Sequence, residues 1–178
     1  MTDPHELMLR PDYLAGLGDR SLDDVRAMRA ECIGVETGLS YLRRLAQGRL
    51  DLVRRELEHR AGDGHVDARS LVEQLSEVLG DGPRSSGGGR LPQTLEPTDV
   101  DPVLAAELDG LAGGAVLNRL AELHDADLAD LAGALTDLER RISERRRACF
   151  VPIDALQAEI TRRYRDGEAS VDTLLRGD

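Results

Sequence analysis

Residues 21–60 read SLDDVRAMRAECIGVETGLSYLRRLAQGRLDLVRRELEHR and contain no proline. Ser21 suits the N-cap of a helix and two aspartates follow in the first turn, so we expect one helix of about 40 residues, roughly 60 Å long. Apolar side chains recur along it at spacings of three and four, interrupted at Arg49, which is typical of a helix that packs along a partner helix. The apolar positions of this seam are Val25, Met28, Cys32, Val35, Leu39, Leu42, Ala46 and Val53.

A second helical pattern runs from about residue 115 to residue 165, and Pro152 inside it should kink or break the helix. Aromatic residues make up only 2% of the chain, whereas hydrophobic residues make up 40%. Leucine, alanine and valine must therefore fill the core, which suits helix-on-helix packing and argues against a β-sandwich. The apolar positions of this second pattern are Leu120, Leu123, Leu128, Leu131, Leu135, Leu138, Ile142, Cys149, Leu156 and Ile160.

The remaining stretches differ in composition from these two patterns. Prolines and glycines punctuate the first 20 residues, which we expect to be a flexible tail. A later stretch is rich in glycine, serine and proline and is predicted to be a disordered linker. The expected organisation is a flexible N-terminal tail at 1–20, a long helix at 21–62, a short acidic amphipathic helix at 66–80, the linker at 81–102, a helical segment at 103–165 that is kinked near Pro152, and a C-terminal segment at 166–178.

Charge and cysteine content exclude several classes of protein. The 178 residues hold 34 acids against 23 bases, all of them arginine, for a net charge of −11, so we expect no direct DNA binding. No apolar run approaches about 18 residues and the N-terminus lacks a signal-like stretch, so we expect a cytoplasmic protein without a membrane segment. The two cysteines and four histidines show no metal-ligand spacing, so we expect no metal site. The sequence shows neither a nucleophile paired with a base nor a cofactor-binding loop, so we do not expect an enzyme.

The two helical patterns contain a repeated segment. Residues 36–51 (ETGLSYLRRLAQGRLD) align with residues 139–154 (ERRISERRRACFVPID) at an offset of 103. The matches include serine and aspartate, which helix formation does not require, so we interpret the repeat as an internal duplication. The two copies are related by a pseudo-two-fold axis only if their helices are antiparallel. We therefore predict an all-α fold, a long antiparallel helical coiled coil with one or two short accessory helices and a flexible Gly/Ser/Pro-rich linker.

The polar residues of each copy form a stripe beside the apolar seam. At 100° per residue, the first stripe is roughly 80° wide and about 22 Å long. A solvated face with intrahelical pairs would explain one stripe, but two stripes together form an arginine-bearing surface suited to a two-fold symmetric ligand. Arginine can bond guanine or phosphate, and a carboxylate can accept from the N–H edge of guanine. The stripe residues are Glu36, Ser40, Arg43, Gln47 and Asp51 in the first copy, and Glu139, Ser143, Arg146 and Asp154 in the second.

The pattern Glu-x3-Ser-x2-Arg-x3-Gln-x3-Asp, complete in the first copy, resembles the signature of RsiG-type anti-sigma factors. The resemblance implies a long antiparallel coiled coil with one motif copy on each helix, which binds cyclic di-GMP as a pair of molecules. In that form, such a protein holds a WhiG-type sporulation sigma factor inactive and so blocks transcription. The resemblance thus implies that the nine stripe residues contact cyclic di-GMP, and that the protein is not an enzyme.

The second copy departs from the motif at its fourth position, where Phe150 replaces glutamine. Either Phe150 packs against a base of the ligand or against the neighbouring helix, or the site is used asymmetrically. Arg44 and Arg147 lie next to the motif arginines and could also reach phosphate. The middle of the chain holds 15 acids and 4 arginines in residues 61–138, which would suit a basic sigma factor. The alternative function is a coiled-coil scaffold or oligomerisation protein without a nucleotide ligand, in which both stripes are merely solvated.

Overall fold

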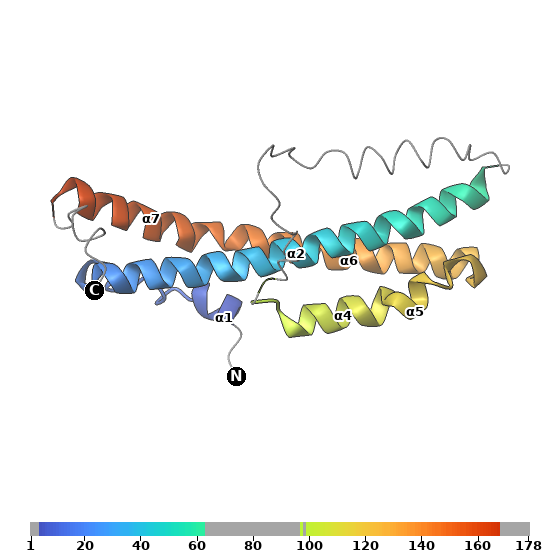
Figure 1. The fold of residues 1–178 in the computed structure, drawn as a ribbon, viewed down its shortest axis with the longest axis horizontal. Coiled ribbons are helices and arrows are strands. Elements are labelled where there is room, and N and C mark those ends of the chain that lie inside the picture. The colour runs from blue at the N-terminus through green and yellow to red at the C-terminus, as the bar shows by residue number, and fades with distance from the viewer. Residues whose placement is uncertain (1–3, 63–96, 98, 168–178) are drawn as a thin grey trace, which may run out of the picture.

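The computed structural model describes residues 4–62, 97 and 99–167, and these form helices joined by turns, with no strand among them. Two long helical arms lie side by side, and shorter helices line one side of them (Figure 1). The predicted all-α class is therefore confirmed. The acidic helix expected at 66–80 lies outside the described residues, as do most of the linker expected at 81–102 and most of the C-terminal segment expected at 166–178.

The first arm is α2 (Leu22–Ala61), a single helix of 40 residues. It begins with a capping box: the Ser21 hydroxyl accepts the backbone N–H of Asp24 at 3.1 Å, and the Asp24 carboxylate accepts the backbone N–H of Ser21 at 3.3 Å. These two bonds satisfy donors that the first turn of a helix leaves without a partner. The helix ends at Gly62, where the backbone becomes extended, so both ends lie where the sequence predicts them.

The second arm consists of α6 (Asp125–Ala148) and α7 (Phe150–Arg165), which run antiparallel to α2 (Figure 1). The break between them is at Cys149, close to the kink expected from Pro152. Pro152 lies in the first turn of α7, where its missing N–H removes no intrahelical hydrogen bond. A break just before the first turn of α7 therefore accommodates the proline with little loss of helix.

The second arm begins ten residues later than the pattern from about residue 115 predicts. Residues 102–122 instead form three short elements: α4 (Pro102–Ala112), α5 (Gly114–Leu117) and the 3-10 helix η2 (Leu120–Glu122). The glycines at 113 and 114 stop α4, because glycine is a poor helix former and Gly113 is extended. The leucines of this stretch keep a helical spacing, but they pack against the core from these separate short elements rather than from one long helix.

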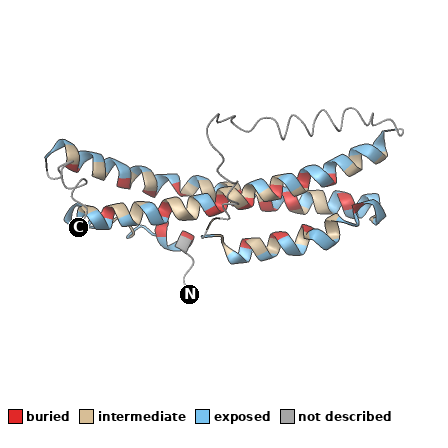
Figure 2. Ribbon diagram, in the orientation of Figure 1, coloured by how far each residue is buried: buried red, intermediate tan, exposed pale blue. Residues whose placement is uncertain are grey.

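The core is a stripe of apolar side chains between the two arms (Figure 2). Leu39 and Ile142, which the repeat alignment pairs, are both buried in it. The seam predicted on α2 is therefore present, with Met28 and Val35 at its partly buried margin. Arg49, which interrupts the seam, turns toward α4 and donates to the Leu108 carbonyl oxygen at 2.9 Å and the Asp109 carboxylate at 2.7 Å.

The described residues near the N-terminus do not form the flexible tail that we expected at 1–20. They contain the helix α1 (Pro4–Met8) and the 3-10 helix η1 (Leu17–Asp19). His5 and Met8 are buried, and the His5 Nε2 atom lies 3.0 Å from the carbonyl oxygen of Arg145. Prolines and glycines do end regular helix here, but apolar side chains between them still pack against the arms.

After the expected linker, helix begins within one residue of its predicted start at 103, because α4 begins at Pro102. Asp101 is the N-cap of α4 and its carboxylate accepts the N–H groups of residues 103 and 104 at 2.9 and 3.0 Å. Just before this cap the chain crosses α2 at Gly38 in close contact. A Cβ at Gly38 would overlap the carbonyl oxygen of Asp99 and lie 2.9 Å from its carbonyl carbon. The missing side chain of Gly38 is what allows this crossing.

The duplication extends well beyond the two motif copies. The starts of α2 and α6, and the positions of η1 and η2, are all separated by 103 residues, the offset of the motif alignment. Each half of the repeat thus consists of a 3-10 turn, which we call the leading turn, followed by a long helix. Sequence comparison of the motif alone did not detect this extension.

Two arginines at matching positions fasten the leading turns. Arg60 on α2 binds the leading turn of the second half, and Arg163 on α7 binds that of the first half. Each also bonds the glutamate four residues before it at 2.7 Å. The carbonyl oxygens bound are those of Leu120, Ala121 and Leu123 for Arg60, and of Leu17, Gly18 and Arg20 for Arg163. Each end of the helix pair is thereby closed by the same set of contacts.

Candidate functional site

The two polar stripes meet across the contact between α2 and the second arm. Arg43 of the first copy donates from Nε to the Glu139 carboxylate and to the Ser143 hydroxyl of the second copy, both at 3.1 Å. These contacts join the two helices near the middle of the molecule. The stripes are therefore not the independent solvated faces, held by intrahelical pairs alone, that we considered as an alternative.

The second copy makes the same contacts in reverse. Arg146 donates from Nε to the Glu36 carboxylate and to the Ser40 hydroxyl, both at 2.8 Å. Within each copy the serine also donates to its own glutamate, at 2.8 Å for Ser40 and 2.9 Å for Ser143. We call these six residues the reciprocal network: each arginine is held by the serine and glutamate of the other copy.

The reciprocal network lies at the edge of the core rather than inside it. The side chains of Glu36 and Glu139 are 18% and 22% exposed, and those of Arg146 and Arg43 are 28% and 36% exposed. Each carboxylate faces one guanidinium, so the network is neutral as a whole. Charge-assisted hydrogen bonds of this kind are short and directional, and they fix the rotamers of both arginines. These bonds use only the Nε–H group of each arginine, so a ligand could still bind the terminal guanidinium nitrogens while the glutamates hold Nε.

The fourth motif position is where the two copies differ. Gln47 donates from Nε2 to the Glu139 carboxylate at 3.2 Å and so adds a further bond to one half of the network. Phe150 has no such group, and the Arg146 guanidinium lies over its ring, 5.1 Å from the centroid. Phe150 thus packs against a motif residue of its own arm, a contact that the sequence analysis did not consider, and its side chain is still partly exposed.

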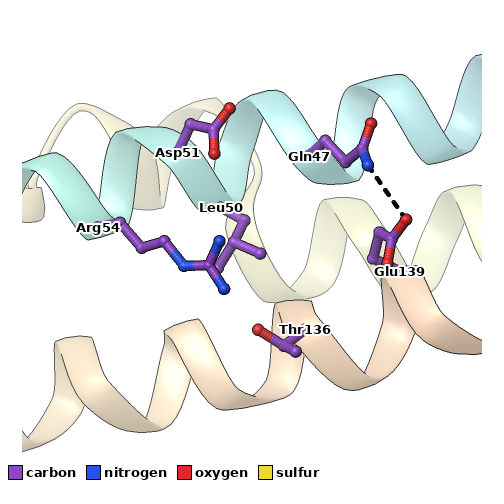
Figure 3. Close-up of a pocket in the computed structure, with 6 residues that line it drawn as sticks. All are labelled: Gln47, Leu50, Asp51, Arg54, Thr136 and Glu139. Carbon is purple, nitrogen blue, oxygen red and sulfur yellow. Dashed lines mark hydrogen bonds between the residues drawn. The ribbon is translucent and has the colours of Figure 1, made fainter.

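A pocket of about 390 Å³ opens beside the first copy, between α2 and α6 (Figure 3). Ligand pockets in proteins span about 300–1,000 Å³, so this one has room for a base or a sugar phosphate. Its lining includes Glu139 from the second arm and Asp51, the last motif residue, from α2. The lining residues are Gln47, Leu50, Asp51, Arg54, Thr136 and Glu139.

Arg54 is one of three pocket residues that the sequence did not indicate as site residues, the others being Leu50 and Thr136. Arg54 lies 18 positions after Glu36, which at 100° per residue returns to the centre of the stripe. Extending the stripe beyond the five motif positions would therefore have identified it. Its guanidinium points toward the second arm across the open pocket, on the side of Thr136 (Figure 3).

The other predicted site residues lie outside the reciprocal network. Asp51 and Asp154, the last residues of the two copies, are both exposed. Arg44 and Arg147 are exposed as well, and Arg44 donates from Nε to the carbonyl oxygen of Ser40 at 3.2 Å. Apart from this bond to the Ser40 backbone, no hydrogen bond or ion pair within the described part of the chain joins these four side chains to the network. They are free to bind a ligand from solution.

Both cysteines are core residues, as the sequence predicts. Cys149 is buried between α6 and α7, and burial, together with the negative charge of Glu36, raises the pKa of its thiol to about 11. Cys32 is also buried.

In the described part of the chain, no group of three or more histidine, cysteine and acidic residues is placed to hold a metal ion. No helix in that part is both long and apolar enough to cross a membrane.

Fold and site together define an all-α protein in which two antiparallel arms carry duplicated polar motifs that meet at their contact. Its particular relationship comes from comparison with known families. A family model described as RsiG-like matches residues 11–79 and 114–177, which include both motif copies, and the chain belongs to this family. The family is one of regulatory anti-sigma factors. No match is found among the curated proteins.

Proposed function

We propose that this protein is an anti-sigma factor that binds cyclic di-GMP, two molecules per chain, on its two motif copies. The observation that supports this most directly is the reciprocal network. It brings two arginines, two serines and two glutamates together in a pseudo-two-fold arrangement, and cyclic di-GMP is itself two-fold symmetric. The proposed contacts are made by the stripe residues of both copies, with Arg44, Arg147 and Phe150 at their margins.

The residue types suit the two parts of such a ligand. The motif arginines can form bidentate bonds with phosphate or with guanine O6 and N7. Asp51 and Asp154, exposed beside the network, can accept the N1–H and N2–H₂ groups that distinguish guanine from adenine. Phe150, still partly exposed, offers a ring face on which a base can stack.

We further propose that the ligand-loaded form sequesters a WhiG-type sporulation sigma factor. Sigma factors bind DNA and carry basic surfaces, whereas this chain has a net charge of −11. Opposite charge favours association and makes it weaken as salt rises, since the Debye length is about 10 Å at 0.1 M. Ligand that fixes the relative position of the arms would raise the affinity for the sigma factor, and linkage then requires the sigma factor to raise ligand affinity by the same factor.

One alternative needs its own test, because the reciprocal network already pairs both arginines with carboxylates without any ligand. The protein would then be a coiled-coil scaffold in which the network only sets the register of the arms. Isothermal titration with cyclic di-GMP separates the two functions, with cyclic di-AMP as the control ligand, because adenine lacks the N–H edge that the aspartates would read. We expect two cyclic di-GMP per chain and little binding of cyclic di-AMP.

The regulatory part of the proposal needs a second experiment. A WhiG-type sigma factor is titrated with the protein in the presence and in the absence of cyclic di-GMP, at two salt concentrations. Tighter binding with ligand supports the proposal. Equal affinity in both conditions would contradict the coupling while leaving ligand binding intact, and no binding in either would favour the scaffold.

A further inference from the structure

The offset of 103 residues allows the two halves of the site to be compared position by position. The pocket beside the first copy defines the first half-site, and the equivalent positions define the second half-site. The first half-site consists of Gln47, Leu50, Asp51, Arg54, Thr136 and Glu139. The second half-site consists, in the same order, of Phe150, Ile153, Asp154, Gln157, Ile33 and Glu36.

The two half-sites keep the same acids but differ in their other polar groups. Each has one aspartate and one glutamate at matching positions. At three positions the second half-site has a less polar or uncharged residue: phenylalanine for glutamine, glutamine for arginine, and isoleucine for threonine. The difference therefore removes one positive charge and two hydrogen-bonding groups from the second half-site.

Arg54 is the only cation among the six lining residues of the first half-site. The structure records no ion pair or hydrogen bond between Arg54 and any other described residue, in contrast to Arg43, which Glu139 and Ser143 hold. Arg54 can therefore bind an anion without first giving up a protein partner. Its counterpart Gln157 is uncharged and donates from Nε2 to the Thr161 hydroxyl at 3.2 Å.

We infer that Arg54 is a phosphate-binding residue outside the motif, and that it makes the first half-site the tighter of the two. This inference rests on the proposed function. The phosphodiester of cyclic di-GMP carries the negative charge that Arg54 can pair with, while Asp51 and Gln47 face the same pocket and can hold the base. In the second half-site a base can stack on Phe150, but no cation stands at the position equivalent to Arg54.

Arg54→Ala is the direct test, with Arg55→Ala as the matched control. Both residues are exposed on α2 and both changes remove one positive charge, but Arg55 does not line the pocket. We expect Arg54→Ala to weaken the tighter cyclic di-GMP binding step about tenfold, since hydrogen bonds to a charged group are worth more than neutral ones and exposure reduces that gain. Arg55→Ala should change the affinity less than about twofold, because its charge is screened.

The converse variant tests the asymmetry itself. Gln157→Arg places a cation in the second half-site, and we expect it to tighten the weaker binding step by a similar factor. Circular dichroism should be unchanged in all three variants, because the substituted side chains are exposed.

The outcomes separate this inference from the function on which it rests. A wild-type chain that binds no cyclic di-GMP would contradict the proposed function. Wild-type binding that Arg54→Ala and Arg55→Ala weaken equally would overturn only the inference about Arg54. A Gln157→Arg chain with an unchanged weaker step would overturn the explanation of the asymmetry.

Discussion

Replacing single glycines of α2 by alanine tests how closely the chain before α4 approaches this helix. Gly38 and Gly48 both lie inside α2, where alanine is the better helix former by about 1 kcal/mol. Their surroundings differ. At Gly48 a new Cβ would meet no atom within 4 Å beyond the backbone of its own helix turn and its chain neighbours, whereas at Gly38 it would overlap the Asp99 carbonyl oxygen and lie 3.4 Å from the Cα of Val100.

The two substitutions should therefore change the free energy of unfolding in opposite directions. For Gly48→Ala we expect a gain of about 0.5–1 kcal/mol, mainly because the unfolded chain loses conformational freedom. For Gly38→Ala the same gain is outweighed by displacement of a packed backbone segment, which typically costs about 1–3 kcal/mol. The displaced segment leads directly into Asp101, the N-cap of α4, so part of that cap is also lost. We expect a net loss of about 1–2 kcal/mol.

Urea unfolding followed by far-ultraviolet circular dichroism measures both values, and the slope with urea checks that the two variants unfold in the same way. The comparison is internal, because both changes are glycine to alanine in one helix. If Gly38→Ala stabilised the protein as much as Gly48→Ala, the segment at 99–101 would not lie against α2, and the packing described for the start of α4 would be wrong.

Three further predictions concern the arginines. Arg43→Ala and Arg146→Ala should each weaken cyclic di-GMP binding by about 1–3 kcal/mol in isothermal titration with circular dichroism unchanged, and unchanged affinity in both would remove the stripes as the site. Arg163→Ala should lower the free energy of unfolding by about 1–3 kcal/mol in urea, because two carbonyl oxygens of a leading turn lose their bonds to the guanidinium and the Leu17 oxygen keeps only a 3.4 Å bond from the Arg20 N–H; a loss below that would mean that the turn finds other donors. Hydrogen bonds from Arg162 and from the next arginine lower the pKa of Glu159 from 4.5 to about 2, so its stabilising effect is complete above pH 4.5 and lost as the pH falls toward 2. Stability of Glu159→Gln should therefore depend less on pH across that window, and an equal pH dependence would contradict the ion pairing.

The sequence predicted α2 almost to the residue, for a physical reason. A proline-free seam, a capping serine and a following glycine are all local signals, and nothing in the surrounding structure overrides them. The start of the second arm was misplaced because the leucines at 117, 120 and 123 keep a helical spacing in a stretch that forms only the short helix α5 and the 3-10 helix η2. Spacing reports which residues are buried, but it does not distinguish a helix from turns that bury the same residues.

The candidate site was predictable as a set of residues but not as a set of contacts. The angular positions of the stripe residues around each helix placed Arg43 and Glu139 on polar faces. These angles contain no information on how far the two helices are shifted along their axes relative to each other. This shift decides that Arg43 meets Glu139 rather than a residue one turn away. Arg54 was missed for a different reason, since the motif comparison ended at Asp51 and the helix stripe continued.

The presence of both halves in one chain has a consequence for how such a site can change over generations. In a symmetric homodimer every substitution appears twice, so a residue that harms one half-site harms both. Here a mutation alters one half-site only, and the residues of the other half-site stay unchanged. Phe150 opposite Gln47, and Arg54 opposite Gln157, are differences of this kind, in which one half-site carries a residue that the other lacks.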